Sequence, residues 1–312
     1  MSQTLPRRGG MLARAWDSDF LYSFRRSPVA AAAALVLAVV VVGAVFCRWL
    51  APHDPFDLVS LNLMDSFKPP LFVGADAEWS FPLGTDDQGR DVLSGILYGT
   101  RISLLVGALA IGFALVVGIT FGLVAGYVGG VVDSLLMRIA DIQLTFPAIL
   151  IALLVDGIVQ AVLPRSFHEQ TALYVLVFAI GIARWPQFAR TVRGSTLVER
   201  NKEYVMAARV IGRSSWKIMT GHILPNVLGP VLVIATLNLG LAILDEATLS
   251  FLGVGLPPTQ PSLGTLIRIG NDFLFSGEWW VTIFPGITLA VLVLSINLLG
   301  DWLRDALNPR LR

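Results

Sequence analysis

The chain has 312 residues, of which 55% are hydrophobic and 14% charged, with a formal net charge of +1 and a mean hydropathy of +0.71. Its apolar runs are too long and too free of charge for soluble cores, so the composition excludes a pair of soluble domains and indicates a membrane protein. Cys47 is the only cysteine, which excludes an intramolecular disulfide. The three histidines, His53, His168 and His222, are isolated, without the spacing of a metal site.

Six apolar runs approach or meet the roughly 20 residues that a membrane-spanning helix needs. In chain order they are 29–47, 102–125, 139–158, 171–183, 227–244 and 281–299. The fourth is short and can lengthen through TALYVLVFAIGIARW. The first follows Arg25 and Arg26, but it is too long for a signal-peptide core and no A-x-A site follows it. Phe46 and Arg48 argue against lipoprotein cleavage at Cys47, so we expect an uncleaved first helix.

We therefore predict an all-α, polytopic membrane protein with six transmembrane helices. The expected segments are an N-terminal segment 1–28, a first helix 29–50, an outer loop 51–100, a five-helix core 101–303 that includes the loop 184–226, and a tail 304–312. The side of each loop follows from its lysines and arginines, which favour the cytoplasm. Most of the 23 basic residues fall in the termini and in the loops 126–138 and 184–226, including Arg184. Both termini are thus predicted to be cytoplasmic.

The outer loop 51–100 is rich in acids. They are Asp54, Asp57, Asp65, Asp76, Glu78, Asp86, Asp87 and Asp91. Its last part, from Asp91 to Arg101, is predicted to form a short amphipathic helix that leads into the second span. The apolar side of that helix comprises Val92, Leu93, Ile96 and Leu97. Two interpretations of the acids stay open, a solvated loop and a docking or gating role outside the membrane.

The spans carry little that would support other classes of transporter or an enzyme. The second and sixth spans have no charge, and Asp245 and Glu246 close the fifth at its outer end, so no proton relay is evident. A channel is less easily excluded, because backbone carbonyls can build a filter. The lysines Lys68, Lys202 and Lys217 follow Phe, Asn and Trp, so no Gly-Lys dipeptide and no Walker A loop exists. If ATP drives this protein, another chain binds it.

Glycines on the second span are spaced for close helix packing. Gly118 and Gly122 form a GxxxG pair, and so do Gly122 and Gly126. Such faces let helices approach closely in lipid. This pattern fits a packed bundle and a helical partner.

The stretch EYVMAARVIGRSSWKIMTGHILPN, residues 203–226, has a helix-turn-helix outline. Asn201 can cap a first helix, with Glu203 in the first turn at the positive end of the helix dipole. Apolar residues then recur at i, i+3, i+4 and i+7: Tyr204, Ala207, Ala208 and Ile211. Gly212 should end this helix, because glycine adopts a left-handed conformation at little cost.

A second short helix is predicted from Ser214 or Ser215 to Pro225. Alanines at 207 and 208 suit a helix that sits deep in a partner's groove. A DNA-binding helix-turn-helix has a similar outline, but tethering between membrane helices and a second helix with only Lys217 as a basic residue argue against it. A plain connector would not need an apolar stripe facing the cytosol.

With these residues the chain resembles a known family. The stretch 203–226 resembles the EAA loop of permease subunits in bacterial ABC importers, and more specifically it resembles the C-type permease of the dipeptide/oligopeptide/nickel group. Further motifs resemble it in the same order: FRRSPVA, LGTDDQGRDVLSGILYGTRISLLVG, GYVGGVVDSLLMRIADIQLTFPAIL, LSFLGVGLPPTQPSLGTLI and FPGITLAVLVLSINLLGDWLRDALNPRLR. The sequence departs from the general pattern where Met206 precedes Ala207 and where His222 stands in place of Ile. The acid is Glu203, so its exact role is open.

The resemblance implies a type I importer permease in the bacterial inner membrane, with no catalytic residue and no cofactor of its own. The implied partners are a second permease, two cytoplasmic ATPases that bind ATP and Mg, an extracytoplasmic substrate-binding protein and membrane lipid, without nucleic acid. The residues implied to contact the ATPases are Glu203, Tyr204, Ala207, Ala208, Arg209, Gly212, His222, Leu224 and Pro225. The candidates for an outer gate or receptor contact are Asp245, Glu246 and Phe251, with ordinary interfacial capping as the alternative. The expected cargo is a di- or oligopeptide, with nickel or a nickel chelate as the alternative, and an ATP-independent channel or a secondary transporter as more distant ones.

Overall fold

The computed structural model describes residues 19–55, 57, 61–73, 77–164, 167–257 and 259–307. The predictions that concern residues 1–18, Asp76, Arg165 and 308–312 lie outside these described residues. The described part of the chain is helical, with one isolated β-bridge between Thr85 and Asp91. The helices are α2 (Asp19–Arg26), α3 (Pro28–Val45), α4 (Cys47–Leu50), α5 (Val92–Val128), α6 (Gly130–Leu144), α7 (Ala148–Val162), α8 (His168–Glu199), α9 (Glu203–Val210), α10 (Ser215–Ile218), α11 (Leu224–Phe251), α12 (Leu263–Asn271) and α13 (Trp280–Leu307).

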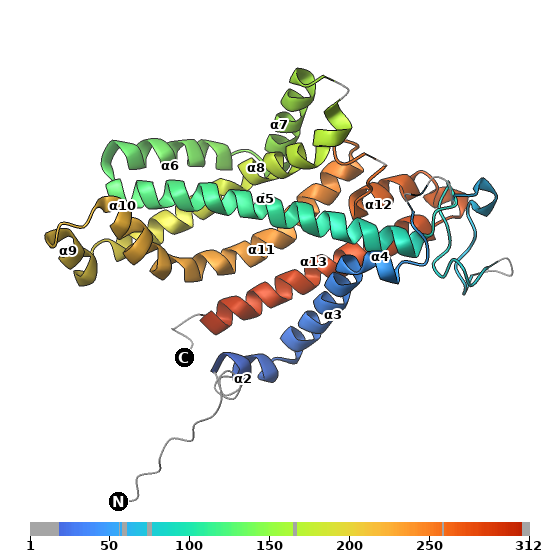
Figure 1. The fold of residues 1–312 in the computed structure, drawn as a ribbon, viewed down its shortest axis with the longest axis horizontal. Coiled ribbons are helices and arrows are strands. Elements are labelled where there is room, and N and C mark those ends of the chain that lie inside the picture. Colours follow the sequence, from blue (N-terminus) through green and yellow to red (C-terminus); the bar gives the residue numbers. More distant parts are fainter. Residues whose placement is uncertain are drawn as a thin grey trace, which may run out of the picture.

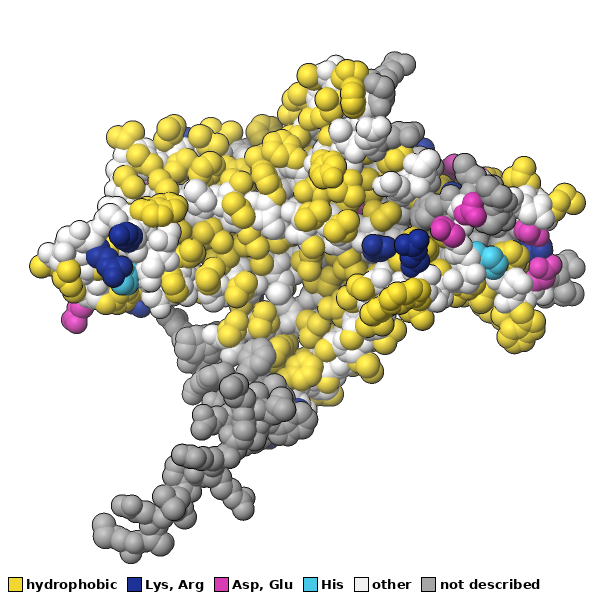
Figure 2. All heavy atoms as spheres, in the orientation of Figure 1, with side chains coloured by type: hydrophobic (Ala, Val, Ile, Leu, Met, Phe, Trp, Pro, Cys, Tyr) yellow, Lys and Arg dark blue, Asp and Glu magenta, His cyan; other side chains and the backbone are white. Residues whose placement is uncertain are grey.

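The all-α membrane fold is confirmed. Among the described residues, five helical runs are long and apolar enough to cross a membrane: 28–45, 92–128, 170–199, 215–251 and 280–307. The pair α6 and α7 would make a sixth span if it counts as one. Figure 2 shows hydrophobic side chains over the middle of the molecule, with most charged ones toward its two ends. This distribution is what a lipid-embedded bundle requires.

The centre of the bundle is the contact between α5 and α8, which lie side by side in Figure 1. A Cβ added at Gly118 would lie 2.4 Å from the Cβ of Phe188, and one at Gly126 would lie 2.7 Å from that of Thr196. The two helices therefore run parallel, and glycine lets their backbones touch. The GxxxG face predicted for the second span thus packs on a helix of the same chain.

Helix α11 runs antiparallel to α5. A Cβ at Gly107 would lie 2.7 Å from Ile243, and Ser103, one turn earlier on α5, bonds to Glu246, one turn later on α11. The bundle consequently has two ends. We call them the α9 end, where α5 and α8 finish and α11 begins, and the loop end, which carries residues 61–73, 77–91 and α12 (Figure 1).

The apolar run 139–158, predicted as the third span, is broken in the structure. The region consists of α6 and α7, which are bent by 96° relative to each other. Pro147 lies at the N-cap of α7 and cannot donate a backbone hydrogen bond to the preceding turn, so the helix is interrupted there. Residues 130–138, expected to be loop, belong to α6.

Several helices extend beyond the apolar runs that predicted them. Helix α8 continues to Glu199, so the first part of the predicted loop 184–226 is helical. Pro225 does not end a helix, because the helical run 215–251 is continuous through a π-helical segment at Met219–Ile223. A proline removes one hydrogen bond and crowds the carbonyl four residues earlier, and a π-helical turn is one way to accommodate it.

The expected short helix at 91–101 is also part of a longer one. Helix α5 runs without interruption from Val92 to Val128, and Asp91 caps it by accepting a hydrogen bond of 2.8 Å from the backbone nitrogen of Ser94. The expected boundary between residues 100 and 101 therefore falls inside a helix.

Candidate functional site

Helix α9 projects at the end of the bundle (Figure 1), and its first turn differs from the prediction. Lys202 occupies the N-cap position of α9, without a side-chain cap. The side chain of Asn201, which was expected to be the cap, donates instead to the carbonyl oxygen of Leu197 on α8 at 3.1 Å. The prediction that Asn201 caps this helix is therefore wrong, whereas Glu203 does lie in the first turn.

Gly212 ends α9 as the sequence predicts. Its φ is +80°, in the left-handed region, and no atom lies within 4 Å of an added Cβ, so conformation rather than space selects glycine here. The nitrogen of Gly212 donates to Arg209 O at 3.0 Å, and that of Arg213 donates to Ala208 O at 3.1 Å. These two bonds form a Schellman motif, which satisfies carbonyl groups that the helix itself leaves free.

The predicted apolar stripe of α9 divides between two faces. Val205 is fully buried and Ala208 is 7% exposed, so both pack on the bundle, whereas Ala207 is exposed. The expectation that both alanines face a partner is thus wrong for Ala208. The exposed apolar side chains of this region are Tyr204, Met206, Val210, Ile211 and Trp216. We call these five residues together with Ala207 the α9 face.

Three contacts hold α9 against the transmembrane helices. The guanidinium of Arg209 lies 4.9 Å from the ring centre of Tyr127, near the end of α5. The hydroxyl of Tyr204 donates a short hydrogen bond to Glu199, the last residue of α8. The amide nitrogen of Asn226, at the start of α11, donates to the same hydroxyl at 3.1 Å. Tyr204 thus links α8, α9 and α11.

This polar cluster changes the acidity of the phenol. Burial, and after it the hydrogen bond to Glu199, raises the pKa of Tyr204 to about 12. Lys202 forms an ion pair of 2.6 Å with the same carboxylate of Glu199. Tyr204 therefore stays neutral and acts as a donor throughout the physiological range.

The remaining residues predicted for this site lie beyond α9. The ring of His222 faces that of Tyr204 at 6.5 Å, and its Nε2 is buried without a hydrogen-bond partner among the described residues. Its backbone oxygen accepts from Asn226 at 2.7 Å. Leu224 is half-buried and Pro225 is exposed at the start of α11. His222 therefore lies between α9 and the start of α11, beside Tyr204 and Asn226, rather than on the α9 face.

The two acids expected at the outer end of the fifth span lie inside α11, which continues to Phe251. They therefore do not cap the helix, which was the alternative interpretation. Both Nε and Nη2 of Arg184 donate to Asp245 Oδ2, at 2.9 and 2.6 Å. Arg184 is only 7% exposed, and its assignment to a cytoplasmic loop is wrong.

Glu246 is fully buried and bonds to α5. It accepts hydrogen bonds of 2.7 Å from the hydroxyl groups of Ser103 and Ser250, and Ser103 also accepts from the backbone nitrogen of Leu263 at the start of α12. This carboxyl group thereby joins α5, α11 and α12. Phe251, the third candidate of the set, is 38% exposed.

Arg184 and Ser103 were not predicted from the sequence as partners of these acids. The one available signal for Arg184 was its position within the extended run TALYVLVFAIGIARW, where an arginine inside a span calls for a buried partner.

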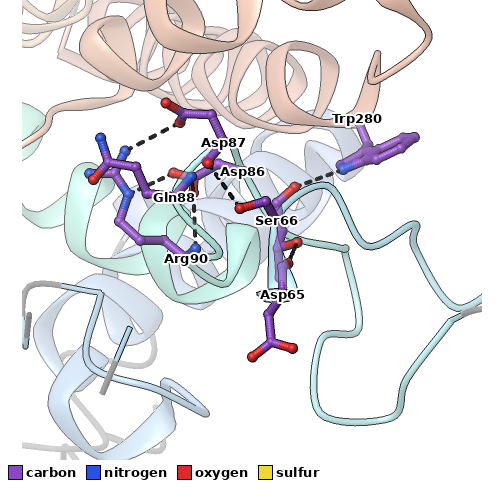
Figure 3. A network of polar contacts seen from close by, with 8 residues as sticks. Asp65, Ser66, Asp86, Asp87, Gln88, Arg90 and Trp280 are labelled. Atoms are coloured by element: carbon purple, nitrogen blue, oxygen red, sulfur yellow. Dashed lines mark hydrogen bonds and ion pairs between the residues drawn. The ribbon is translucent and has the colours of Figure 1, made fainter. Parts of the chain in front are cut away.

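The acidic loop is organised rather than uniformly solvated (Figure 3). Asp86 is 4% exposed and pairs with Arg90 at 2.6 Å. The indole nitrogen of Trp280 donates to Thr85 O at 3.1 Å, which fixes the loop to α13. Burial raises the pKa of Asp91, partly offset by the hydrogen bonds from Ser94 that hold this cap. At least these acids have structural roles.

Comparison with known proteins assigns the chain to a family. Residues 118–312 match the family described as "Binding-protein-dependent transport system inner membrane component", and residues 15–70 match the "N-terminal TM domain of oligopeptide transport permease C". The chain belongs to this family of permease components of ABC importers. Several of the similar proteins are named as dipeptide permeases, in agreement with the predicted resemblance.

Three such relatives illustrate the match. The di/tripeptide transport system permease protein DppC of Pseudomonas aeruginosa is 37% identical over 94% of this chain and 92% of its own. The dipeptide permease DppC of Escherichia coli K12 is 38% identical over 94% of this chain and 93% of its own. That of Haemophilus influenzae is 35% identical over 94% and 95%. A solved structure of the MetNI methionine ABC transporter, in an inward-facing conformation, shares the fold with a TM-score of 0.53 and 19% identity over 67% of this chain and 94% of that one.

Proposed function

We propose that this chain forms half of the translocation path of an ATP-driven importer for di- and oligopeptides, and that the α9 face binds an ATPase subunit. The observation that carries the proposal is an exposed apolar surface on a helix fixed to three transmembrane helices. Val210 is 87% exposed and Ile211 80% exposed, although each lies within one turn of the buried Ala208. Apolar side chains gathered on one exposed face of a short helix are typical of a helix that seats in a partner's groove.

The proposed mechanism depends on the contacts that fix α9 to the transmembrane helices. Because Tyr204 and Arg209 connect α9 to α5, α8 and α11, a displacement of α9 by closing ATPases would move the transmembrane helices as a body. The work comes from unequal binding of two conformations to ATP and to the loaded receptor, since a ligand shifts only those equilibria whose states it binds unequally. This chain performs no chemistry. ATP and Mg bind to the partner ATPases.

The proposed assembly comprises this chain, a second permease, two ATPases and an extracytoplasmic substrate-binding protein in the bacterial inner membrane, with the termini and α9 in the cytoplasm. Peptide cargo is supported by the names of the relatives, which are di- and tripeptide permeases. Nickel or a nickel chelate is the second candidate cargo. Among the described residues no group of three His, Cys, Asp or Glu side chains could hold a metal ion, which favours peptides.

The test alters α9 in the reconstituted complex: Ala207→Arg places a charge on the α9 face, and Gly212→Pro replaces the residue that ends the helix. Ala207→Arg and Gly212→Pro should leave membrane insertion normal and reduce both peptide uptake and substrate-stimulated ATP hydrolysis at least tenfold. The matched control is Ala161→Arg, an exposed alanine at the loop end of α7, which should retain both. Full ATPase coupling in both α9 variants would refute the assignment of the α9 face.

Uptake by the unmodified complex tests the cargo and the energy source. Labelled dipeptide should accumulate and labelled nickel should not, and accumulation should require ATP and persist when the proton gradient is dissipated. Flux of dipeptide without ATP would indicate a channel, and loss of uptake when the proton gradient is dissipated would indicate a secondary transporter.

A further inference from the structure

At the loop end, residues of α7, α8, α12 and the loop after α11 line a cavity of about 200 Å³ that is partly open to solvent. One wall is formed by the end of α7 and the start of α8, another by the loop after α11, and Arg268 of α12 completes it. The residues that line it are Asp156, Val159, Gln160, Leu163, His168, Thr171, Ala172, Val175, Gly253, Gly255, Leu256, Pro257 and Arg268. None of these residues is among the site residues predicted from the sequence.

One charged group in this lining is the buried carboxylate of Asp156. Asp156 is 5% exposed, and its Oδ2 accepts a hydrogen bond of 2.6 Å from the neutral amide of Gln160. Among the described residues no cation forms an ion pair with it. A buried carboxylate without a counter-charge is costly, so a cation that enters the cavity would be bound favourably beside it.

The second charged group is a guanidinium on another wall. Arg268 likewise forms no ion pair with the described acids. It rests on the loop at Gly253, where φ is +82° and an added Cβ would lie 2.8 Å from its Nη1. The loop itself is held in place, since Leu256 is 5% exposed and Val254 N donates to Leu249 O at 3.0 Å.

The third titratable side chain in the lining, His168, is already engaged. Its Nε2 lies 2.9 Å from the carbonyl oxygen of Leu163. The lining therefore includes one acidic and one basic group, neither of which forms an ion pair within the described chain, together with apolar and polar side chains.

We propose that this cavity binds a small zwitterion, with its ammonium group at Asp156 and its carboxylate at Arg268. This volume of about 200 Å³ lies below the roughly 300–1,000 Å³ of pockets for drug-sized ligands, which favours a ligand of the size of an amino acid or a short dipeptide. Since Arg268 is exposed, a ligand can enter from its side. Given the proposed peptide import, the cavity is a place at which the permease itself contacts the free ends of its cargo.

The test is photo-crosslinking of the complete transporter in lipid nanodiscs. The probe is a dipeptide of alanine and diazirine-bearing leucine with free termini, compared with the same dipeptide acetylated and amidated at its ends. The free probe should label residues 156–175 or 253–257, and free dialanine should compete. Asp156→Asn and Arg268→Gln should each reduce labelling at least tenfold, which is about 1.4 kcal/mol. The blocked probe should label weakly and should not respond to either substitution.

The matched controls are Asp141→Asn and Arg190→Gln, which make the same chemical changes in an exposed pair between α6 and α8. These should label as the unmodified complex does. Equal labelling by the blocked probe, or unchanged labelling in both cavity variants, would overturn the inference.

Uptake of the free dipeptide by the same complex separates this inference from the proposed function. Uptake without cavity labelling refutes the cavity alone. Labelling that depends on both charges in a complex that imports no peptide refutes the cargo and leaves the cavity as a zwitterion site.

Discussion

The ion pair between Arg184 and Asp245 provides the sharpest test of the buried interface between α8 and α11. The side chains are 8% and 16% exposed, and Arg184 Nη2 lies 2.6 Å from Asp245 Oδ2. At an effective dielectric constant near 20, this separation corresponds to an attraction of about 6 kcal/mol. Removing two charges from water costs several kcal/mol for each, so the net contribution of the intact pair should be small.

Substituting one partner should therefore lower the free energy of unfolding far more than substituting both. We expect Arg184→Met or Asp245→Val alone to lower the free energy of unfolding by about 3–5 kcal/mol, because the remaining charge is buried and unpaired. The double variant should lie within about 2 kcal/mol of the unmodified protein, since neither charge is then left. The purified chain is unfolded in mixed micelles by titration with sodium dodecyl sulfate, and the loss of helicity is monitored.

The control is a second double-mutant cycle, on the exposed pair of Asp141 and Arg190. Their side chains are 60% and 59% exposed and 3.7 Å apart, so this cycle should give a coupling energy below about 1 kcal/mol. If the effects of Arg184→Met and Asp245→Val instead add to within about 0.5 kcal/mol, the two buried groups do not interact and the reasoning fails.

Two further predictions concern α5 and α9. Gly122→Val should destabilise the chain by about 1–3 kcal/mol in the same titration, because an added Cβ would lie 2.6 Å from Ala189 O. Gly112→Val should not destabilise it, because no atom lies within 4 Å of a Cβ added there. Equal effects of the two substitutions would contradict close packing of α5 on α8. The raised pKa of Tyr204 means that folding favours the neutral phenol, so its contribution to stability is present below pH 10 and lost as pH rises through about 12. Since Tyr204 is 38% exposed, screening by solvent reduces this contribution to about 1 kcal/mol. Tyr204→Phe should abolish the part of the decline in thermal stability between pH 10 and 12 that comes from this phenol. Tyr174→Phe, at a side chain that is 71% exposed, should leave the decline unchanged.

Hydropathy and local chemistry were sufficient for the membrane class, the approximate positions of the apolar runs and the end of α9. A span needs only a continuous apolar run, and Gly212 ends a helix through its own conformation, so both can be inferred without knowledge of the neighbours. The family was likewise predicted from motifs in order, and the matches over 118–312 and 15–70 confirm it. The functional roles proposed for the α9 residues stay predictions.

Helix boundaries were predicted less well, because hydropathy reports burial in lipid and not helicity. Helix α8 continues through Arg184, whose charge would end an apolar run but does not end a helix. Conversely, the apolar run 139–158 reads as one span although Pro147 interrupts it.

What the sequence by itself determined was therefore local: which stretches enter the membrane, and where one short helix stops. Only the tertiary structure decided that Arg184 meets Asp245 across 61 positions, that Ala208 turns inward while Ala207 faces out, and that Asp156 and Arg268 share one cavity. The reason is geometric. Each of these relations depends on how one helix is rotated and displaced against another, and that is set by the packing of many side chains together rather than by any single pattern along the chain.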